Sequence, residues 1–222
     1  MNGEYFINEK IAAGKKVLAE GAQGSMLDVD FGTFPFVTSS NTISAGVCTG
    51  LGIAPQRIKE VIGITKAYCT RVGEGPFPTE LLDETGNFLR NAGNEFGSTT
   101  GRPRRCGWMD MVALKFACMI NGVTQIVMTK ADILDGLDEL KVCRSYSING
   151  EETQKIPFQM NKLEITANYQ SFEGWKTDIT KINQFAAIPP TMKKYVDYLC
   201  QYLGVPIKYI SNGPGRDQLL AV

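Results

Sequence analysis

Apolar runs separated by polar, glycine-rich segments predict a chain in which strands alternate with helices. Residues 62–68, 124–128 and 205–210 are rich in β-branched and other apolar side chains, as buried strands are. Residues 109–121 are apolar around most of a helical surface, so we expect a buried helix there. Gly122 follows that segment and is suited to end the helix in the left-handed conformation.

The most regular helical pattern lies near the carboxyl end. Apolar side chains recur there at i, i+3, i+4 and i+7 spacing, which predicts one buried face: Met192, Tyr195, Val196, Leu199 and Leu203. We expect Pro189-Pro190 to open this helix and Gly204 to end it. Weaker patterns predict helices at residues 7–14, 55–61 and 81–90, strands at residues 17–19 and 140–147, and an edge strand at residues 165–172. Residues 91–107 and 151–162 read as irregular.

These elements together indicate a fold class. Strands that alternate with helices imply an α/β fold, with a mostly parallel sheet covered by helices on both faces. We find no internal repeat and no linker that would divide the chain. Residues 1–222 are therefore interpreted as belonging to one domain.

The composition narrows the classes of function. The chain has 222 residues, and its 23 basic and 23 acidic residues balance, so bulk charge gives no reason to expect nucleic-acid binding. The apolar residues 109–120 are too few to cross a bilayer, and the first residues lack the pattern of a signal peptide. We expect a cytoplasmic protein with neither a membrane nor a nucleic-acid partner.

Cysteine and histidine usage limits the chemistry. The six cysteines are scattered without a Cys-x-x-Cys pair, so we interpret them as free thiols in a reducing compartment. The chain has no histidine, which removes the commonest general base and the commonest transition-metal ligand. We predict no metal ligands in this chain.

A first candidate site follows residues 17–19. Gln23 lies between Gly21 and Gly24, which allow a sharp turn and the close approach of a ligand. Its amide can both donate and accept hydrogen bonds, and open α/β sheets bind ligands at the carboxyl ends of their strands. From spacing alone, however, an ordinary turn with an exposed glutamine is favoured.

A second candidate is Lys130-Ala131-Asp132, directly after the strand predicted at residues 124–128. A carboxylate there can accept two parallel hydrogen bonds from N1 and N2 of guanine, whereas adenine presents a lone pair at N1. The alternative is a solvated Lys and Asp at a strand end, and a bare Lys-x-Asp motif is weak evidence. Residues 211–213 follow the last predicted strand and could supply backbone contacts to the same base.

A third candidate is the polar loop at residues 97–108. Arg102, Arg104 and Arg105 fall within four residues, and such a cluster repels itself unless an anion offsets it. The planar fork of arginine suits carboxylate and phosphate. The alternative is a solvated basic loop, or one that touches nucleic acid.

Five blocks of this sequence resemble the adenylosuccinate synthetase family, in family order and over nearly the whole chain. They are residues 17–40, 65–81, 94–108, 129–136 and 211–214. That family joins L-aspartate to inosine monophosphate at the expense of GTP. The resemblance implies a P-loop-NTPase-like synthetase fold, Mg²⁺ as cofactor, GTP as a substrate, and a homodimer.

The resemblance also implies which residues contact which ligand. The GTP contacts would be Arg104, Lys130, Ala131, Asp132, Ser211, Asn212 and Gly213. The aspartate contacts would be Ser98, Thr99, Thr100, Gly101, Arg102, Pro103 and Arg104. The contacts to inosine monophosphate would be Gln23, Thr38, Val72 and Arg102.

Roles follow from the chemistry of these groups. Gln23 is expected to act catalytically, because an amide donor near the 6-oxygen of the base could stabilise charge that develops there. Thr38 would hold the nucleotide phosphate through its hydroxyl. Val72 would touch the ribose through its backbone, although a valine after a strand is usually part of the core. Pro103 cannot donate a backbone hydrogen bond, and its neighbours would carry the charge.

Two parts of the family pattern have no counterpart here. The family's amino-terminal motif, Gly-Asp-Glu-Gly-Lys-Gly-Lys, and the histidine that follows it are absent; residues 14–16, Gly-Lys-Lys, lack the upstream glycine. We therefore expect a carboxyl-terminal portion of the enzyme that is inactive alone, with the general base and Mg²⁺ ligands in the missing part. The alternative is a non-catalytic guanine-nucleotide-binding or regulatory module derived from the same family.

Overall fold

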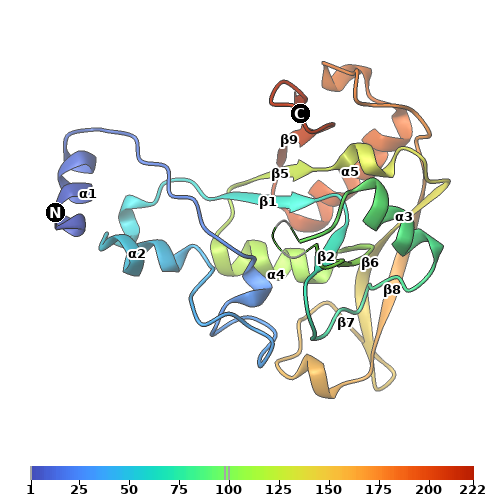
Figure 1. Cartoon of the computed structure of the whole chain (residues 1–222), viewed down its shortest axis with the longest axis horizontal. Coiled ribbons are helices and arrows are strands. Elements are labelled where there is room, and N and C mark those ends of the chain that lie inside the picture. The colour runs from blue at the N-terminus through green and yellow to red at the C-terminus, as the bar shows by residue number, and fades with distance from the viewer. Residues whose placement is uncertain (1, 98, 100) are drawn as a thin grey trace.

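The structure is a computed structural model that describes residues 2–97, 99 and 101–222. Its body is built from two four-stranded sheets, and the first helices stand off to one side of that body (Figure 1). Strands and helices alternate along the chain, so the predicted α/β class is confirmed.

The first sheet positions the candidate site. Its order is β1 (Ile62–Lys66), β5 (Gln125–Thr129), β9 (Ile207–Ser211) and β10 (Leu219–Ala221). The first three strands are parallel and β10 is antiparallel to β9. The three strands expected from apolar runs are therefore confirmed, each within two or three residues of its predicted ends.

The second sheet is largely antiparallel, which the alternation of elements did not indicate. Its central strand β6 (Glu139–Ile148) pairs in parallel with β4 (Met109–Asp110), and antiparallel with β7 (Glu151–Thr153) and β8 (Ile165–Glu173). β8 is an edge strand, as expected. A separate antiparallel pair joins β2 (Cys69–Arg71) to β3 (Arg105–Gly107), and β3 lies inside residues 91–107, for which the sequence predicts irregular structure.

The helices that pack on the body follow the predicted patterns. All five residues of the apolar stripe in α5 (Pro190–Leu203) are buried. α4 (Met111–Asn121) packs against α5, and Gly122 and Gly204 end these helices with φ of 62° and 68°. Left-handed backbone of this kind is strained for any residue with a Cβ, which explains glycine at both ends.

α3 (Glu84–Ala92) confirms the helix expected near residues 81–90. Asp83 caps it by accepting a hydrogen bond from the backbone N–H of Gly86. A Cβ at Gly86 would lie 2.1 Å from the carbonyl oxygen of Leu81, so close packing requires glycine there.

The amino-terminal region departs most from expectation. α1 (Gly3–Ala12) and α2 (Ala45–Leu51) contain no buried residue. The strand predicted at residues 17–19 is wrong: the segment is irregular, and Leu18 is 87% exposed, because no neighbouring strand lies beside it in the described structure. The helix expected at residues 55–61 is also wrong, since only a single 3₁₀ turn forms at Pro55–Arg57 before the chain becomes extended.

Short 3₁₀ turns complete the chain at Ser25–Leu27, Ala131–Leu134, Met160–Lys162 and Phe185–Ala187. All six cysteines are free thiols, and burial raises the pKa of Cys118 to about 11. Within the part of the chain that the structure describes, no helix is long and apolar enough to span a membrane.

Candidate functional site

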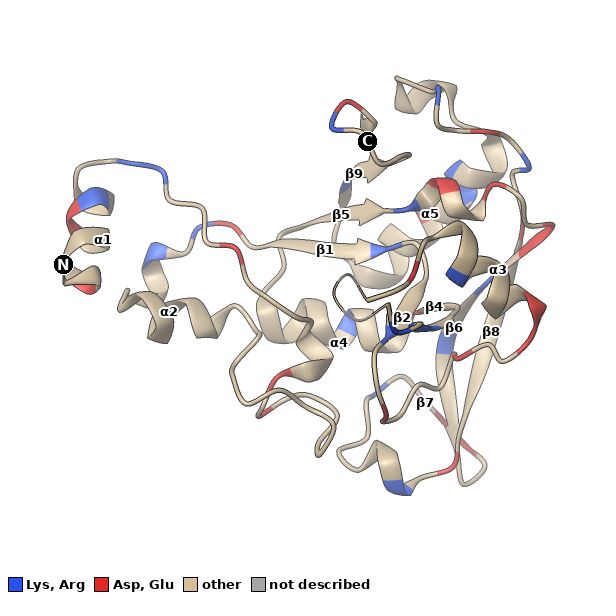
Figure 2. Ribbon diagram, viewed as in Figure 1, with Lys and Arg blue, Asp and Glu red and all other residues tan. Residues whose placement is uncertain are grey.

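The three parallel strands bring the predicted guanine contacts to one edge of the sheet. β5 lies between β1 and β9, with Lys66 paired to Thr129 and Met128 paired to Ile210. The segments that follow β5 and β9 therefore emerge side by side. Basic residues mark the carboxyl ends of β1 and β5 (Figure 2), and this is the edge where open α/β sheets bind ligands.

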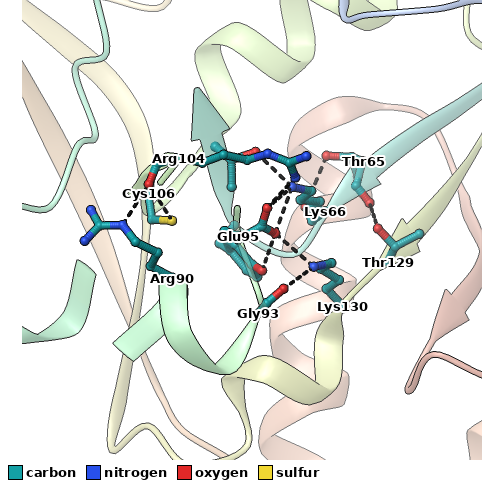
Figure 3. A network of polar contacts seen from close by, with 11 residues as sticks. Thr65, Lys66, Arg90, Gly93, Glu95, Arg104, Cys106, Thr129 and Lys130 are labelled. Carbon is teal, nitrogen blue, oxygen red and sulfur yellow. Dashed lines mark hydrogen bonds and ion pairs between the residues drawn. The ribbon is translucent and has the colours of Figure 1, made fainter. Parts of the chain in front are cut away.

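A fully buried carboxylate, Glu95, organises this edge (Figure 3). Lys66 Nζ lies 2.8 Å from both carboxylate oxygens, and the Tyr68 hydroxyl donates to Oε1 at 2.7 Å. Arg104 donates to Oε2 at 2.7 Å, and Lys130 Nζ lies 3.0 Å from Oε1. One buried anion thus holds three cations that come from β1, the arginine loop and the turn after β5.

The electrostatics of Glu95 follow from these contacts. Burial alone would raise the pKa of its carboxyl, but hydrogen bonds from Lys66, Tyr68, Lys130 and Arg104 outweigh it and lower the pKa to about 2. Burial lowers the pKa of Lys66, and hydrogen bonding to Glu95 opposes that shift. The cluster of three cations and one carboxylate keeps a surplus positive charge at the edge of the sheet.

Lys130 and Asp132 occupy a tight turn after β5. The backbone of Lys130 is left-handed, with φ of 61°, and its ammonium also donates to the Gly93 carbonyl. Asp132 follows in a 3₁₀ turn and is half-buried; burial raises the pKa of its carboxyl. Among the described residues, the Asp132 carboxylate joins no ion pair.

The first two residues after β9, Asn212 and Gly213, are buried. Asn212 is fully buried, and its amide donates to the carbonyls of Ile179 and Ile182. Its Oδ1 has no hydrogen-bond partner in the described structure. A Cβ at Gly213 would lie 2.4 Å from the Gln218 side chain, so glycine lets that side chain cover the turn.

Internal carboxylates offset Arg104 and Arg105 of the arginine cluster. Arg105 forms a bidentate pair with Glu80, at 2.7 and 2.5 Å, and Arg104 pairs with Glu95. The expectation that an external anion must offset the whole cluster is therefore corrected for Arg104 and Arg105.

Backbone contacts also hold together the residues on either side of the loop, from Phe96 to Pro103. The N–H of Gly97 donates to the Arg102 carbonyl, and the N–H of Gly101 donates to the Gly97 carbonyl. Phe96 forms an isolated antiparallel β-bridge with Pro103. Thr99 is exposed, whereas Ser98 and Thr100 lie outside the described residues.

Two of the residues predicted to contact inosine monophosphate, Thr38 and Val72, lie on segments that contact each other. Arg71 donates to the Thr33 hydroxyl and the Phe36 carbonyl, which ties the segment of Val72 to the loop that carries Thr38. Val72 is 56% exposed, so it is not the core residue that its position after a strand favours. Gln23 is exposed with φ of 60°, in a separate turn.

Sequence reasoning missed Glu95 and Lys66 as site residues. Glu95 lies within the third block of family resemblance, but nothing in its local sequence distinguishes it from an exposed loop glutamate. Its role depends on cations that are distant along the chain. Among the described residues, no group of three or more His, Cys, Asp or Glu side chains could hold a metal ion.

Comparison with known proteins identifies the family of the chain. The family model described as adenylosuccinate synthetase matches residues 1–220. Adenylosuccinate synthetases from Azobacteroides pseudotrichonymphae genomovar. CFP2 and Flavobacterium johnsoniae are 56% and 53% identical over 220 residues; each alignment covers 99% of this chain and 52% of the relative. The chain spans about half the length of the curated relatives it matches.

Two solved structures are also similar. The fully ligated adenylosuccinate synthetase from Plasmodium falciparum is 42% identical with a TM-score of 0.96, over 100% of this chain and 54% of that one. A cyanophage S-2L succinoaminodeoxyadenylate synthetase, bound to dGMP and dATP, is 16% identical with a TM-score of 0.62, over 98% of this chain and 49% of that one, and shows a shared fold alone. From the family match and the close agreement in fold, the chain belongs to the adenylosuccinate synthetase family.

Proposed function

We propose that this chain forms the GTP-binding and aspartate-binding part of an enzyme that joins L-aspartate to inosine monophosphate. The observation that carries the proposal is the shared carboxyl edge of β5 and β9, where Lys130–Asp132 and residues 211–213 emerge side by side. In the reaction of the family, GTP phosphorylates the 6-oxygen of inosine monophosphate, and the aspartate amine then displaces phosphate.

Asp132 is proposed to select guanine. Its carboxylate, which makes no ion pair in the described part of the chain, would accept hydrogen bonds from N1 and N2 of the base. Lys130 would lay its methylene stem along the flat base while its ammonium stays on Glu95. Ser211, Asn212 and Gly213 would line the opposite side of the base through their backbone.

The arginine loop is proposed to bind aspartate and to reach both nucleotides. Residues 98–104 would surround the aspartate carboxylates, with Arg102 also reaching inosine monophosphate and Arg104 also reaching GTP. Arg104 keeps about a third of its side chain exposed while it pairs with Glu95, so its remaining N–H groups can still serve a ligand. Gln23, Thr38 and Val72 would contact the base, phosphate and ribose of inosine monophosphate.

Further assignments extend from the family to the whole enzyme. We propose that it works in the cytoplasm as a homodimer and uses Mg²⁺. Among the described residues no group of three or more His, Cys, Asp or Glu side chains could hold a metal ion, and we propose that the Mg²⁺ ligands belong to the part of the enzyme outside this chain. No step of the reaction is therefore assigned to a metal held by this chain.

Nucleotide selectivity tests the proposed pocket. We expect the folded chain to bind GTP more tightly than ATP, and Asp132→Ala in the complete enzyme to weaken GTP far more than inosine monophosphate. Each lost charge-assisted hydrogen bond costs about 1.5–3 kcal/mol, so GTP affinity should fall at least tenfold. Glu164→Ala is a control, because Glu164 is exposed and forms no ion pair within the described chain. Equal loss of both nucleotides from a folded protein would make Asp132 structural.

Turnover separates an enzyme portion from a binding module. Adenylosuccinate formation would be measured with inosine monophosphate, GTP, L-aspartate and Mg²⁺, first with this chain and then with the remaining half of a relative added. We expect activity only in the combined sample. A folded chain that binds GTP but never supports turnover in either sample would favour the non-catalytic module.

A further inference from the structure

Glu95 connects three structural elements that the proposed GTP pocket and aspartate loop both need. Its backbone carbonyl accepts the N–H of Arg104, and its own N–H donates to the Arg90 carbonyl, so the base of the arginine loop is closed at this residue. Its carboxylate then reaches Lys66 at the end of β1 and Lys130 after β5. One residue therefore ties the arginine loop to two neighbouring strands of the sheet.

The position of Lys130 creates a competition between two carboxylates. Lys130 lies two residues before Asp132 in a tight turn. Burial raises the pKa of the Asp132 carboxyl and the charge of Lys130 opposes that shift, so the ammonium lies near Asp132 as well as Glu95. In the structure the ammonium of Lys130 lies 3.0 Å from Glu95 and also donates to the Gly93 carbonyl. Asp132 makes no ion pair in the described part of the chain. A carboxylate that paired with Lys130 would offer fewer free lone pairs and a partly neutralised charge to the N–H groups of a base.

We propose that Glu95 is a positioning residue for guanine selection, acting as an internal counter-ion that keeps Lys130 away from Asp132. This inference rests on the proposed guanine contact of Asp132 and assigns a second residue to that selectivity. The buried carboxylate holds the ammonium, and the Asp132 oxygens stay open to the N1 and N2 hydrogens of the base. Glu95 itself does not touch the ligand.

A double-mutant cycle on Glu95 and Lys130 tests this role. In the folded chain, Glu95→Gln frees Lys130, so we expect the preference for GTP over ATP to fall at least tenfold. Lys130→Met removes the ammonium and keeps an apolar stem for the base, so combining it with Glu95→Gln should restore the preference to within about threefold of the original. A Glu95 that only stabilised the fold would show no such rescue.

The double variant also keeps the proposal testable if the single Glu95→Gln variant fails to fold. Glu95→Gln leaves three cations without their anion, whereas the double variant removes one cation together with the anion. Its cluster therefore keeps the original surplus charge. A folded double variant that has lost the preference for GTP would overturn the proposal by itself. A single Glu95→Gln variant that keeps the full preference would overturn it as well.

A crystal structure of the Glu95→Gln chain without nucleotide gives a readout that is independent of binding. We expect Lys130 Nζ within ion-pair distance of the Asp132 carboxylate. Lys130 still directed at residue 95, with Asp132 unpaired, would refute the counter-ion role. If the unaltered chain binds no GTP, the proposed function fails, while this structure still decides the role of Glu95. Glu164→Gln, an exposed glutamate, serves as the matched control for both measurements.

Discussion

Replacement of Glu95 by glutamine should remove a large, pH-dependent part of the stability of the chain. The carboxyl is fully buried, and its pKa in the folded state is about 2, compared with an ordinary value of 4.5. That difference corresponds to about 3 kcal/mol of stability for the ionised form. Removing one partner of a buried ion pair costs about 3–5 kcal/mol when the remaining charge stays buried. Lys66, Arg104 and Lys130 keep 25%, 31% and 34% of their side chains exposed, so we expect the lower end of that range.

The sign of the pH dependence follows from the lowered pKa. A group whose pKa is depressed in the folded state contributes its full stability above its unfolded pKa, here 4.5. The contribution is lost as pH falls through the folded value of about 2. Most of it should therefore be present at pH 5, and about 2 kcal/mol should be gone at pH 3.

Urea unfolding of the original chain and of Glu95→Gln at pH 7, 5 and 3 measures this effect. The difference in unfolding free energy between the two proteins cancels the titration of other carboxylates. It should be about 3 kcal/mol or more at pH 7 and 5, and clearly smaller at pH 3. A difference that stays constant down to pH 3, or two proteins of equal stability at pH 7, would refute the reasoning. Glu164→Gln should be close to neutral throughout.

Two further predictions concern the helices. Leu199→Ala removes a side chain of α5 that is only 1% exposed, so the free energy of urea unfolding should fall by about 2–5 kcal/mol. Lys193→Ala, on the exposed side of the same helix, is the control and should have little effect. Gly204→Ala adds a Cβ at φ of 68° and should cost about 1 kcal/mol in the same assay. The control is Gly50→Ala, inside α2 with open space around the new Cβ, which should be neutral or stabilising. If Gly204→Ala stabilised the protein instead, the C-cap argument would be contradicted.

The elements that sequence predicts well are those whose signal is local. The apolar stripe of α5 and the left-handed glycines at positions 122 and 204 each depend on a few neighbouring residues, and both predictions are confirmed. The strand expected at residues 17–19 fails for the opposite reason. An apolar run favours burial only if another segment covers it, and no covering segment is present in the described chain.

The same distinction between local signals and contacts distant along the chain applies to the residues of the candidate site. Lys130 and Asp132 can be proposed from their position after an apolar strand, and family resemblance adds the guanine. Glu95 cannot be recognised in this way, since a glutamate in a polar loop is usually solvated. Its burial becomes favourable only when Lys66, Arg104 and Lys130 converge on it, and these residues meet only in the folded sheet.

The order of strands in the first sheet has a consequence for how the protein is made. The register pairs Ile62 with Gln125 and Ile126 with Ile207, so the two edges of β5 pair with strands that lie far from each other along the chain. A growing chain leaves the ribosome from its amino end, and β9 is among the last strands of this sequence to emerge. The edge that would receive the base therefore forms only after β9 has been synthesised. A nucleotide that binds this edge would stabilise chains that include β9 and leave shorter ones exposed to degradation.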